Sequence, residues 1–242
     1  MNVLAFDTCF AAVSAAVRWQ SARGEWLLRE SYEPLTTGHA ERILPVIDAV
    51  MTGAGLTYNQ LDRIAVTLGP GGFTGLRAGI ACARALALAI DRPVVGLSSL
   101  AIMAERANFI LGTRRAGRPM IVAVDARRGG LYLQTFGENA GDPLSAAHLL
   151  TPDEAAEQLP TGPLLMVGSG AAALQKASGR TDAEALLPDL QPHARQLALL
   201  APVLTPLLRV TPNYIRAADA KPSAAPALAR KAGPQAGLKI GS

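Results

Sequence analysis

The stretch TLGPGGFTGLRAGIACARALALA, residues 67–89, decides the fold, because a glycine-rich turn and a helix of small residues follow directly on a buried strand. Four glycines and a proline fall within residues 69–75. The strand is expected over 64–68 and the helix over 76–90, with its opening near Phe73. The first N–H groups of such a helix can hold an anion, whereas glycines can also serve only to allow positive φ in a turn. The residues leave both readings open.

Neither common phosphate-binding pattern fits this turn. A P-loop has two glycines five positions apart, followed by Lys and then Ser or Thr. Here Pro70 stands five positions before Gly75, and Leu76 and Arg77 follow that glycine. The dinucleotide-binding pattern needs its third glycine at a position that Thr74 occupies. The turn therefore does not by itself predict a nucleotide site.

Composition indicates a globular chain with a full hydrophobic core. Half of the 242 residues are hydrophobic, which is enough for one domain or two small ones. The net charge of +4 comes from the C-terminal tail, which carries four cations and no acid after Asp219. Positions 1–220 hold 19 basic and 19 acidic residues. This neutral body gives little support to direct RNA binding.

Cysteine use and hydropathy indicate a soluble, cytoplasmic protein. The two cysteines, Cys9 and Cys82, do not suggest a disulfide framework. Residues 1–3 lack the basic start of a signal peptide. No apolar run is expected to span a membrane, because the best candidate, 78–90, is interrupted by Arg84. We expect no membrane association.

The chain makes a first pass through the element order β-β-β-α-β-α-β-α. Three closely spaced strands predict an antiparallel meander: NVLAFDT, AAVSAAVRW and EWLLRESY. A helix over 40–53 follows, since the apolar positions Ile43, Leu44, Ile47 and Val50 repeat at three and four. The strand at 64–68, the helix after it, another strand and a further helix complete the pass.

A similar order of strands and helices follows with weaker signals, and we interpret it as an incomplete repeat of the first. Its segments are PMIVAVDARRGGLYLQTF, TPDEAAEQL, PLLMVGSG and helices from Ala171 and Ala194. The duplication rests on element order alone. We therefore expect an N-terminal half over 1–112, a smaller C-terminal half over 113–218, and a disordered tail over 219–242.

This plan resembles the actin-like ATPase (ASKHA, ribonuclease H-like) fold, an α/β fold with two related βββαβαβα-type halves, here with the second one truncated. In such proteins nucleotide sits between the halves, at the turn after the first strand of each. Asp7 and Thr8 are the candidate cofactor-binding residues, a carboxylate for hydrated Mg²⁺ beside a hydroxyl. The second turn, after Asp125, places Arg127 and Arg128 where glycine would let the backbone approach phosphate. This disfavours ATP hydrolysis, although arginine side chains can bind phosphate.

Several segments together resemble the TsaB family, also called YeaZ. They are LAFDT, HAERILPVIDAVMTGAGL, GPGGFTGLRAGIACARALA, VDARRGGLY and PNYIR. The resemblance covers about residues 2–216, and its most specific part is the glycine segment. The tail is not covered.

The resemblance implies a subunit without independent catalysis or an intrinsic cofactor. Members of the family pair with the related enzyme TsaD, which carries the metal and transfers threonylcarbamoyl to tRNA adenosine, and the small ATPase TsaE joins the complex. It implies a role in forming N6-threonylcarbamoyladenosine at position 37 of tRNAs reading ANN codons. It also implies contact with tRNA only through the complex, a homodimer in isolation, and room for ATP or ADP at a subunit interface.

The histidines distinguish this chain from TsaD itself. TsaD holds its metal with a His-x-x-x-His pair on the first helix; here His39 is followed four residues later by Ile43, which cannot be a ligand. His148 and His193 lie singly and are expected to be surface or capping residues. We predict no metal site and no catalytic residue. The alternative is a stand-alone ATP-dependent kinase or acyl-transfer enzyme of the same superfamily, with Asp7 as its metal carboxylate.

Small and apolar residues in excess of core needs predict a partner interface on two helices. Small residues run around much of the helix over 76–90, which only Arg77 and Arg84 interrupt. The helix over 40–53 also carries apolar residues beyond its core stripe. Surplus apolar surface on adjacent helices indicates a partner, and small residues allow close helix packing. The predicted interface residues are Leu44, Ile47, Met51, Arg77, Ala78, Ala81, Cys82 and Ala85.

Residues 221–242 are predicted to be dispensable for folding, because Pro, Ala and Gly alternate there with isolated cations and no apolar period. Truncation after Asp219 should leave the thermal midpoint of unfolding unchanged in scanning calorimetry. A drop of many degrees would show that the tail packs on the body.

Overall fold

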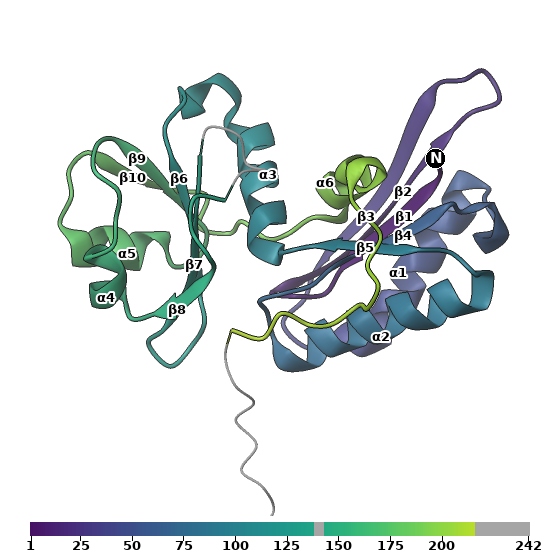
Figure 1. The fold of residues 1–242 in the computed structure, drawn as a ribbon, viewed down its shortest axis with the longest axis horizontal. Coiled ribbons are helices and arrows are strands. Elements are labelled where there is room, and N and C mark those ends of the chain that lie inside the picture. Colours follow the sequence, from purple (N-terminus) through teal and green to yellow (C-terminus); the bar gives the residue numbers. More distant parts are fainter. Residues whose placement is uncertain (138–142, 216–242) are drawn as a thin grey trace, which may run out of the picture.

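The computed structural model describes residues 1–137 and 143–215 and contains two five-stranded sheets side by side (Figure 1). The first sheet has the order β3-β2-β1-β4-β5. Its strands are β1 (Val3–Asp7), β2 (Ala12–Gln20), β3 (Trp26–Pro34), β4 (Arg63–Thr67) and β5 (Val94–Leu97). β1 lies at the centre, antiparallel to β2 and parallel to β4, and all five of its residues are buried. The predicted meander and the strand before the glycine turn are confirmed.

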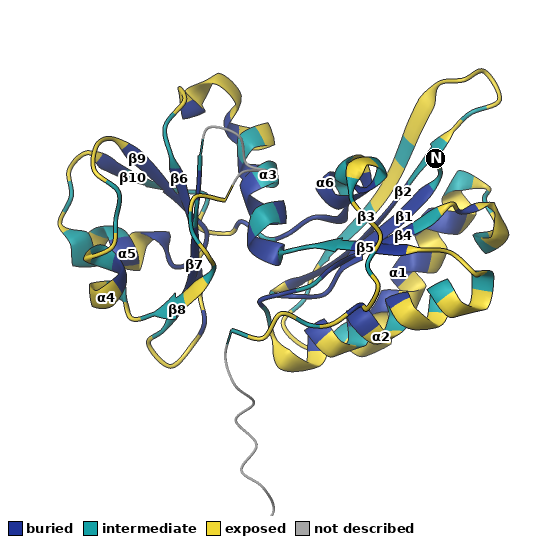
Figure 2. Cartoon of the chain, in the orientation of Figure 1, coloured by how far each residue is buried: buried dark blue, intermediate teal, exposed yellow. Residues whose placement is uncertain are grey.

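Two helices cover one face of the first sheet. They are α1 (His39–Ala54) and α2 (Phe73–Ile90), with the short 3-10 helix η1 (Tyr58–Gln60) between α1 and β4. α1 buries Ile43, Ile47 and Val50 against the strands, as its periodicity predicts, and Gly55 ends it in the left-handed region at φ 66°. α2 opens at Phe73, where the sequence placed the opening. Figure 2 shows the outward sides of both helices exposed.

The second sheet repeats the strand order of the first. Its order is β8-β7-β6-β9-β10, so each half runs third, second, first, fourth and fifth strand across the sheet. The elements are β6 (Met120–Asp125), β7 (Leu131–Phe136), β8 (His148–Leu150), α4 (Pro152–Ala156), β9 (Leu164–Val167), α5 (Ala171–Ser178) and β10 (Ala183–Leu186). The duplicated actin-like plan is confirmed, but the repeat has the full element order. The reduction lies in element length, since α4 has five residues where α1 has 16.

The last helix of each half packs on the sheet of the other half. α3 (Ser99–Leu111) contributes Leu100, Met103 and Ala107 to the core beside the second sheet. α6 (Ala194–Leu200), followed by the 3-10 helix η3 (Ala201–Val203), contributes Leu197 and Ala198 to the core beside the first sheet. The strands of the first sheet end at β5 and those of the second begin at β6, whereas α3 and α6 each pack on the sheet of the other half. The tail over 219–242 lies outside the described residues.

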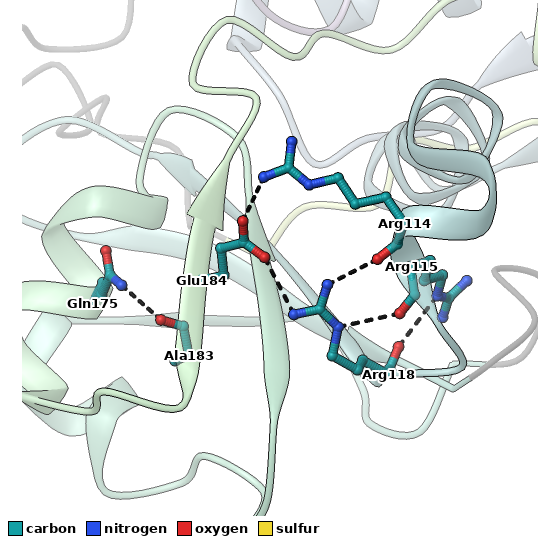
Figure 3. Close-up of polar contacts among 6 residues, drawn as sticks. All are labelled: Arg114, Arg115, Arg118, Gln175, Ala183 and Glu184. Atoms are coloured by element: carbon teal, nitrogen blue, oxygen red, sulfur yellow. Dashed lines mark hydrogen bonds and ion pairs between the residues drawn. The ribbon is translucent and has the colours of Figure 1, made fainter.

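The connection between the halves is a charged turn tied to the edge strand of the second sheet. It is the 3-10 helix η2 (Gly112–Arg115), directly after α3. Glu184 of β10 accepts hydrogen bonds from Arg114 at 2.5 Å and from Arg118 at 3.2 Å (Figure 3). These two arginines lower the pKa of the Glu184 carboxyl. The pairing places charge along a sheet edge, which discourages strand pairing between molecules.

α2 is the one described helix that is long and apolar enough to cross a membrane by length and composition. The expectation that no run reaches that length is therefore not met, because the whole helix Phe73–Ile90, 18 residues, is apolar enough despite Arg77 and Arg84. One such helix is a weak indication, since core helices pass the same test. In this chain the inward side of α2 packs on the first sheet, and Arg77 and Arg84 lie on its outer side.

α6 begins at a buried histidine that caps it. His193 accepts the backbone N–H of Arg195 at Nδ1, 3.1 Å away, and its ring stacks on Tyr32 with centroids 5.0 Å apart. Burial, followed by the nearby Arg106 cation, lowers the pKa of His193 from 6.5 to about 4, with opposing and reinforcing smaller effects of Glu30 and Arg195. His148 is exposed on β8. The prediction that these histidines are capping or surface residues is confirmed.

We predict that His193 makes folding acid-sensitive. A histidine whose pKa is lowered on folding contributes stability that is complete above its unfolded pKa and is lost as pH falls from about 6.5 towards 4. His193→Asn keeps an N-cap acceptor and removes the titration, so its urea midpoint should change less over this range than that of the wild type. His148→Asn is the control and should behave as the wild type. Equal slopes for all three proteins would contradict the prediction.

Candidate functional site

The glycine turn packs directly against the turn that follows β1. A Cβ atom added to Gly71 would lie 2.4 Å from the Cys9 carbonyl oxygen, and one added to Gly75 would lie 2.2 Å from the Thr8 carbonyl oxygen. The backbone N–H of Gly72 donates to the Cys9 oxygen at 2.6 Å. These glycines therefore allow two backbone segments to approach closely. The sequence analysis considered only positive φ and anion binding for this turn. Only Gly69 of this turn needs positive φ, at 96°.

Asp7 and Thr8, the candidate cofactor-binding residues, are enclosed by this packing. Asp7 is fully buried, and its Oδ1 accepts hydrogen bonds from the Thr67 hydroxyl at 2.5 Å and the Cys9 N–H at 3.3 Å. Its Oδ2 has no partner among the described residues. The Thr8 hydroxyl donates to the Gly75 carbonyl oxygen at 2.7 Å. In this conformation neither side chain can contact a nucleotide.

The electrostatics of the first turn also disfavour a cation site. Burial raises the pKa of Asp7, and hydrogen bonds from Thr67 and Cys9 only partly oppose this shift. Burial and the neighbouring Asp7 raise the pKa of the Cys9 thiol as well. Hydrated Mg²⁺ keeps several waters and needs an ionised, accessible carboxylate. The residues of the first turn do not fit that group.

The second turn is open and cationic. Arg127 and Arg128 both adopt the left-handed region, at φ 61° and 54°, and the Arg127 N–H donates to the Asp125 carboxylate at 2.7 Å. A hollow of about 450 Å³ lies beside them. Its lining comprises Asp125, Arg127, Arg128, Gly129, Gly130, Leu131, Pro152, Ser169, Gly170 and Ala173. Two cations against one acid suit an anionic group better than a metal ion.

Side chains from both halves meet between the two turns. The Phe10 ring lies 6.3 Å from the Tyr132 ring, centroid to centroid, and packs against the cores of both halves. The Ala11 N–H donates to the side-chain oxygen of Gln191 at 2.9 Å. The region in which actin-like ATPases hold nucleotide is therefore partly filled by protein contacts here.

The histidine that begins α1 has a structural role. His39 donates from Nε2 to the Phe10 carbonyl oxygen at 2.7 Å, and Ile43 is buried in the core. Among residues 1–137 and 143–215, no three His, Cys, Asp or Glu side chains are placed to hold a metal ion.

The predicted interface residues divide into an exposed and a buried group. Leu44, Arg77, Ala81 and Ala85 are exposed, and Ala78 and Cys82 are partly buried. Ile47 and Met51 are not at the surface: both lie in the core beneath α1, because they share the helix face of Ile43 and Val50. The sequence reading also missed Leu88, whose exposed fraction is 86%. We call Ala81, Ala85 and Leu88 the α2 strip, since spacings of four and three place them on one outward face.

Comparison with known proteins gives consistent results. Residues 33–166 match the family model described as TsaD: tRNA N6-adenosine threonylcarbamoyltransferase. The tRNA threonylcarbamoyladenosine biosynthesis protein TsaB of Escherichia coli K12 is 34% identical over 213 residues, which cover 81% of this chain and 87% of the relative. The protein of the same name from Haemophilus influenzae is 31% identical and covers 89% and 94%. The structure of YeaZ from Pseudomonas aeruginosa superimposes with a TM-score of 0.74 at 29% identity, covering 88% of this chain and 99% of that one.

We predict that Asp7→Asn is stabilising at pH 7.5. The amide keeps the acceptor for Thr67 and Cys9 and removes the cost of ionising a buried carboxyl whose second oxygen has no partner. The free energy of unfolding should rise, because ionising a buried carboxyl costs several kcal/mol, more than the roughly 1–3 kcal/mol of leaving the amide NH2 unpaired at the Oδ2 position. A raised carboxyl pKa means that the stability of the wild type falls as pH rises through it, and Asp7→Asn should lose this trend. Urea titrations at a series of pH values from about 4 to 8 measure both effects, since the trend begins at the unfolded carboxyl pKa of about 3.9.

The control is Asp7→Ala, which removes the acceptor and should be destabilising, because the buried Thr67 hydroxyl then lacks its partner. If Asp7→Asn were as destabilising as Asp7→Ala, the ionised carboxylate would be the form that the fold needs, and the prediction would be wrong.

Proposed function

The chain belongs to the TsaB family, whose relatives are named as tRNA threonylcarbamoyladenosine biosynthesis proteins, and from this membership we propose that it is the non-catalytic subunit that pairs with a TsaD-like enzyme. The observation that carries the proposal is the α2 strip, an exposed row of small and apolar residues on a helix that the fold fixes tightly from its inner side. Exposed apolar rows beside a rigid scaffold are typical of protein–protein contact sites.

The proposed complex forms N6-threonylcarbamoyladenosine at position 37 of tRNAs that read ANN codons. A TsaE-like ATPase is its third member, tRNA contacts the complex rather than this chain alone, and the isolated chain forms a homodimer. The neutral charge of positions 1–220 supports indirect contact with tRNA. The complex is proposed to act in the cytoplasm, where its substrate tRNAs are found.

ATP or ADP is proposed to bind at a subunit interface. The first turn is enclosed, so the cationic hollow beside Arg127 and Arg128 is the surface of this chain that suits phosphate. Asp7 and Thr8 are disfavoured as its ligands because both are buried. Among the features of the described residues, this hollow also favours the alternative function, a stand-alone ATP-dependent kinase or acyl-transfer enzyme.

We predict that the purified chain alone neither hydrolyses ATP nor modifies tRNA. The first turn offers no accessible carboxylate for Mg²⁺, and the second places two arginines beside the hollow. Phosphate release should match the blank in the presence of ATP and Mg²⁺, and should appear when the TsaD-like and TsaE-like chains are added. Substantial turnover by the partner-free chain would establish the alternative.

We predict that Ala81→Glu and Ala85→Glu abolish association while the chain stays folded. Both alanines are exposed, so neither change disturbs the core, but either one buries an unpaired charge in the proposed contact. Such a charge costs several kcal/mol, roughly enough to abolish a micromolar complex. Size-exclusion chromatography measures association with itself and with the TsaD-like chain, and circular dichroism measures folding.

Ala172→Glu is the matched control, an exposed helical alanine on α5 in the other half. It should associate as the wild type does. A folded Ala85→Glu variant that still binds the TsaD-like chain normally would defeat the proposed function.

A further inference from the structure

Residues 204–215 form an extended segment, here called the C-terminal strap, that crosses the outside of the first half. It follows η3, contains no helix or strand, passes β5 and then runs beside α2 (Figure 1). Backbone and arginine contacts hold it at regular intervals. They are Arg63 Nη1 to Leu204 O at 2.8 Å, Leu207 N to Val94 O at 2.8 Å, Arg84 Nε to Val210 O at 2.9 Å, and Asn213 N to Leu68 O at 2.7 Å.

The strap and α1 lie on opposite flanks of the α2 strip. Arg77 and Arg84 are seven residues apart on one side of α2, and both hold the strap, through Tyr214 and Val210. On the other side, a Cβ atom added to Gly75 would lie 3.4 Å from the His39 ring of α1. At 100° per residue, Ala81, Ala85 and Leu88 fall between these two directions. The exposed strip is therefore bordered by a helix on one flank and by the strap on the other.

The strap presents one apolar side chain outward from a fixed backbone. Leu208 is fully exposed, whereas Val210, two residues later, is buried in the core of the first half. Adjacent residues of an extended segment point to opposite sides, and Leu207, directly before Leu208, packs against that same core. The Arg84 contact at Val210 and the Leu207 contact with β5 fix the chain on both sides of Leu208. An exposed leucine on a pinned segment costs little entropy when a partner covers it.

A second outward group lies at the end of the strap. The Tyr214 ring packs on the Phe73 ring with centroids 5.7 Å apart, and its hydroxyl accepts a hydrogen bond from Arg77 at 2.8 Å. The Arg77 guanidinium lies 3.6 Å from the Phe73 ring centroid. Both rings are about two-fifths exposed. Pre-ordered tyrosine and arginine side chains of this kind are over-represented among the residues that dominate binding energy.

We propose that the C-terminal strap is part of the partner surface, and that Leu208 and Tyr214 contact the TsaD-like chain that covers the α2 strip. The inference rests on the proposed function and extends its interface beyond the two helices that the sequence indicates. The TsaD family model matches residues 33–166, which include α1 and α2, so a TsaD-like partner carries a counterpart of this helix pair. Two such faces pack with their axes about 8–10 Å apart. A helix about 10 Å wide over the α2 strip then reaches the side chains on its flank.

The test compares Leu208→Asp and Tyr214→Ala with Val203→Asp, each in the full chain. Val203 is a matched control, since it is 83% exposed, apolar and five residues before Leu208, on η3. The dissociation constant for the purified TsaD-like chain is measured by isothermal titration calorimetry, and self-association by analytical ultracentrifugation. We expect at least tenfold weaker binding for Leu208→Asp, about threefold or more for Tyr214→Ala, and a change below twofold for Val203→Asp. Leu208→Ala, which adds no charge, should show a smaller loss and serves if Leu208→Asp does not fold.

The outcomes separate this inference from the proposed function. Normal binding by Leu208→Asp and Tyr214→Ala, with binding lost in Ala85→Glu, would overturn the role of the strap and leave the proposed function standing. Normal binding by Ala85→Glu as well would defeat both. If Leu208→Asp weakened self-association alone, the surface would belong to a second copy of this chain, and the proposal would be overturned. Equal weakening by Val203→Asp would also overturn it, because the effect would then not be specific to the strap.

Discussion

The close contact between the glycine turn and the end of β1 is the constraint on which the rest of the structure depends. Gly71 and Gly75 bring the backbone of the turn and of α2 against the carbonyl oxygens of Thr8 and Cys9, at distances that no side chain would permit. This contact takes up the Thr8 hydroxyl and seals Asp7 from solvent. It also fixes the rotation of α2 about its own axis, so that one face is held outward. In the first half, the turn after β1 is therefore closed to solvent, and one face of α2 is held at the surface.

The two halves are held together by packing of helices across them, in addition to the connecting turn at η2. α3 and α6 each pack on the sheet of the other half, and the Phe10 and Tyr132 rings meet between the turns. The strap adds a third tie, because Leu207 packs on the first core and Ile215 on the second. These three contacts cross between the two sheets and hold the halves against each other.

Sequence reasoning predicted what short-range patterns encode. Strand β4, the turn and the opening of α2 at Phe73 follow from glycine placement and periodicity, and both duplicated passes were visible in the element order. β8 and β10 were missed because they are short edge strands that are only partly buried, whereas the equally short β5 and β9 carry continuous apolar runs. The crossing of α3 and α6 could not be predicted, since either sheet offers an apolar face to these helices. That choice depends on contacts between residues far apart in the sequence.

The site was predicted less well than the fold, and the misassigned residues lie on α1. Ile47 and Met51 were assigned to the interface because the helix carries more apolar residues than a narrow stripe needs, but the buried stripe of α1 is wide enough to include both. Leu44 falls outside that stripe and is exposed. On α2 the difficulty is different. Glycine and alanine bury so little area that composition alone cannot distinguish the inward face of the helix from the outward face.

Small residues serve a different purpose on each of the two faces of α2. Gly75 and Gly79 face inward, where an added Cβ atom would strike Thr8, and they allow the helix to lie directly on the β1 turn. Ala81 and Ala85 face outward, and their short side chains would let another helix pack at a small interaxial distance. A larger residue on either face would disrupt one of these contacts, and a charged one would do so at greater cost. The glycine-rich stretch therefore combines two requirements: inward glycines that let α2 lie on the turn after β1, and outward alanines that keep the exposed face of the helix flat.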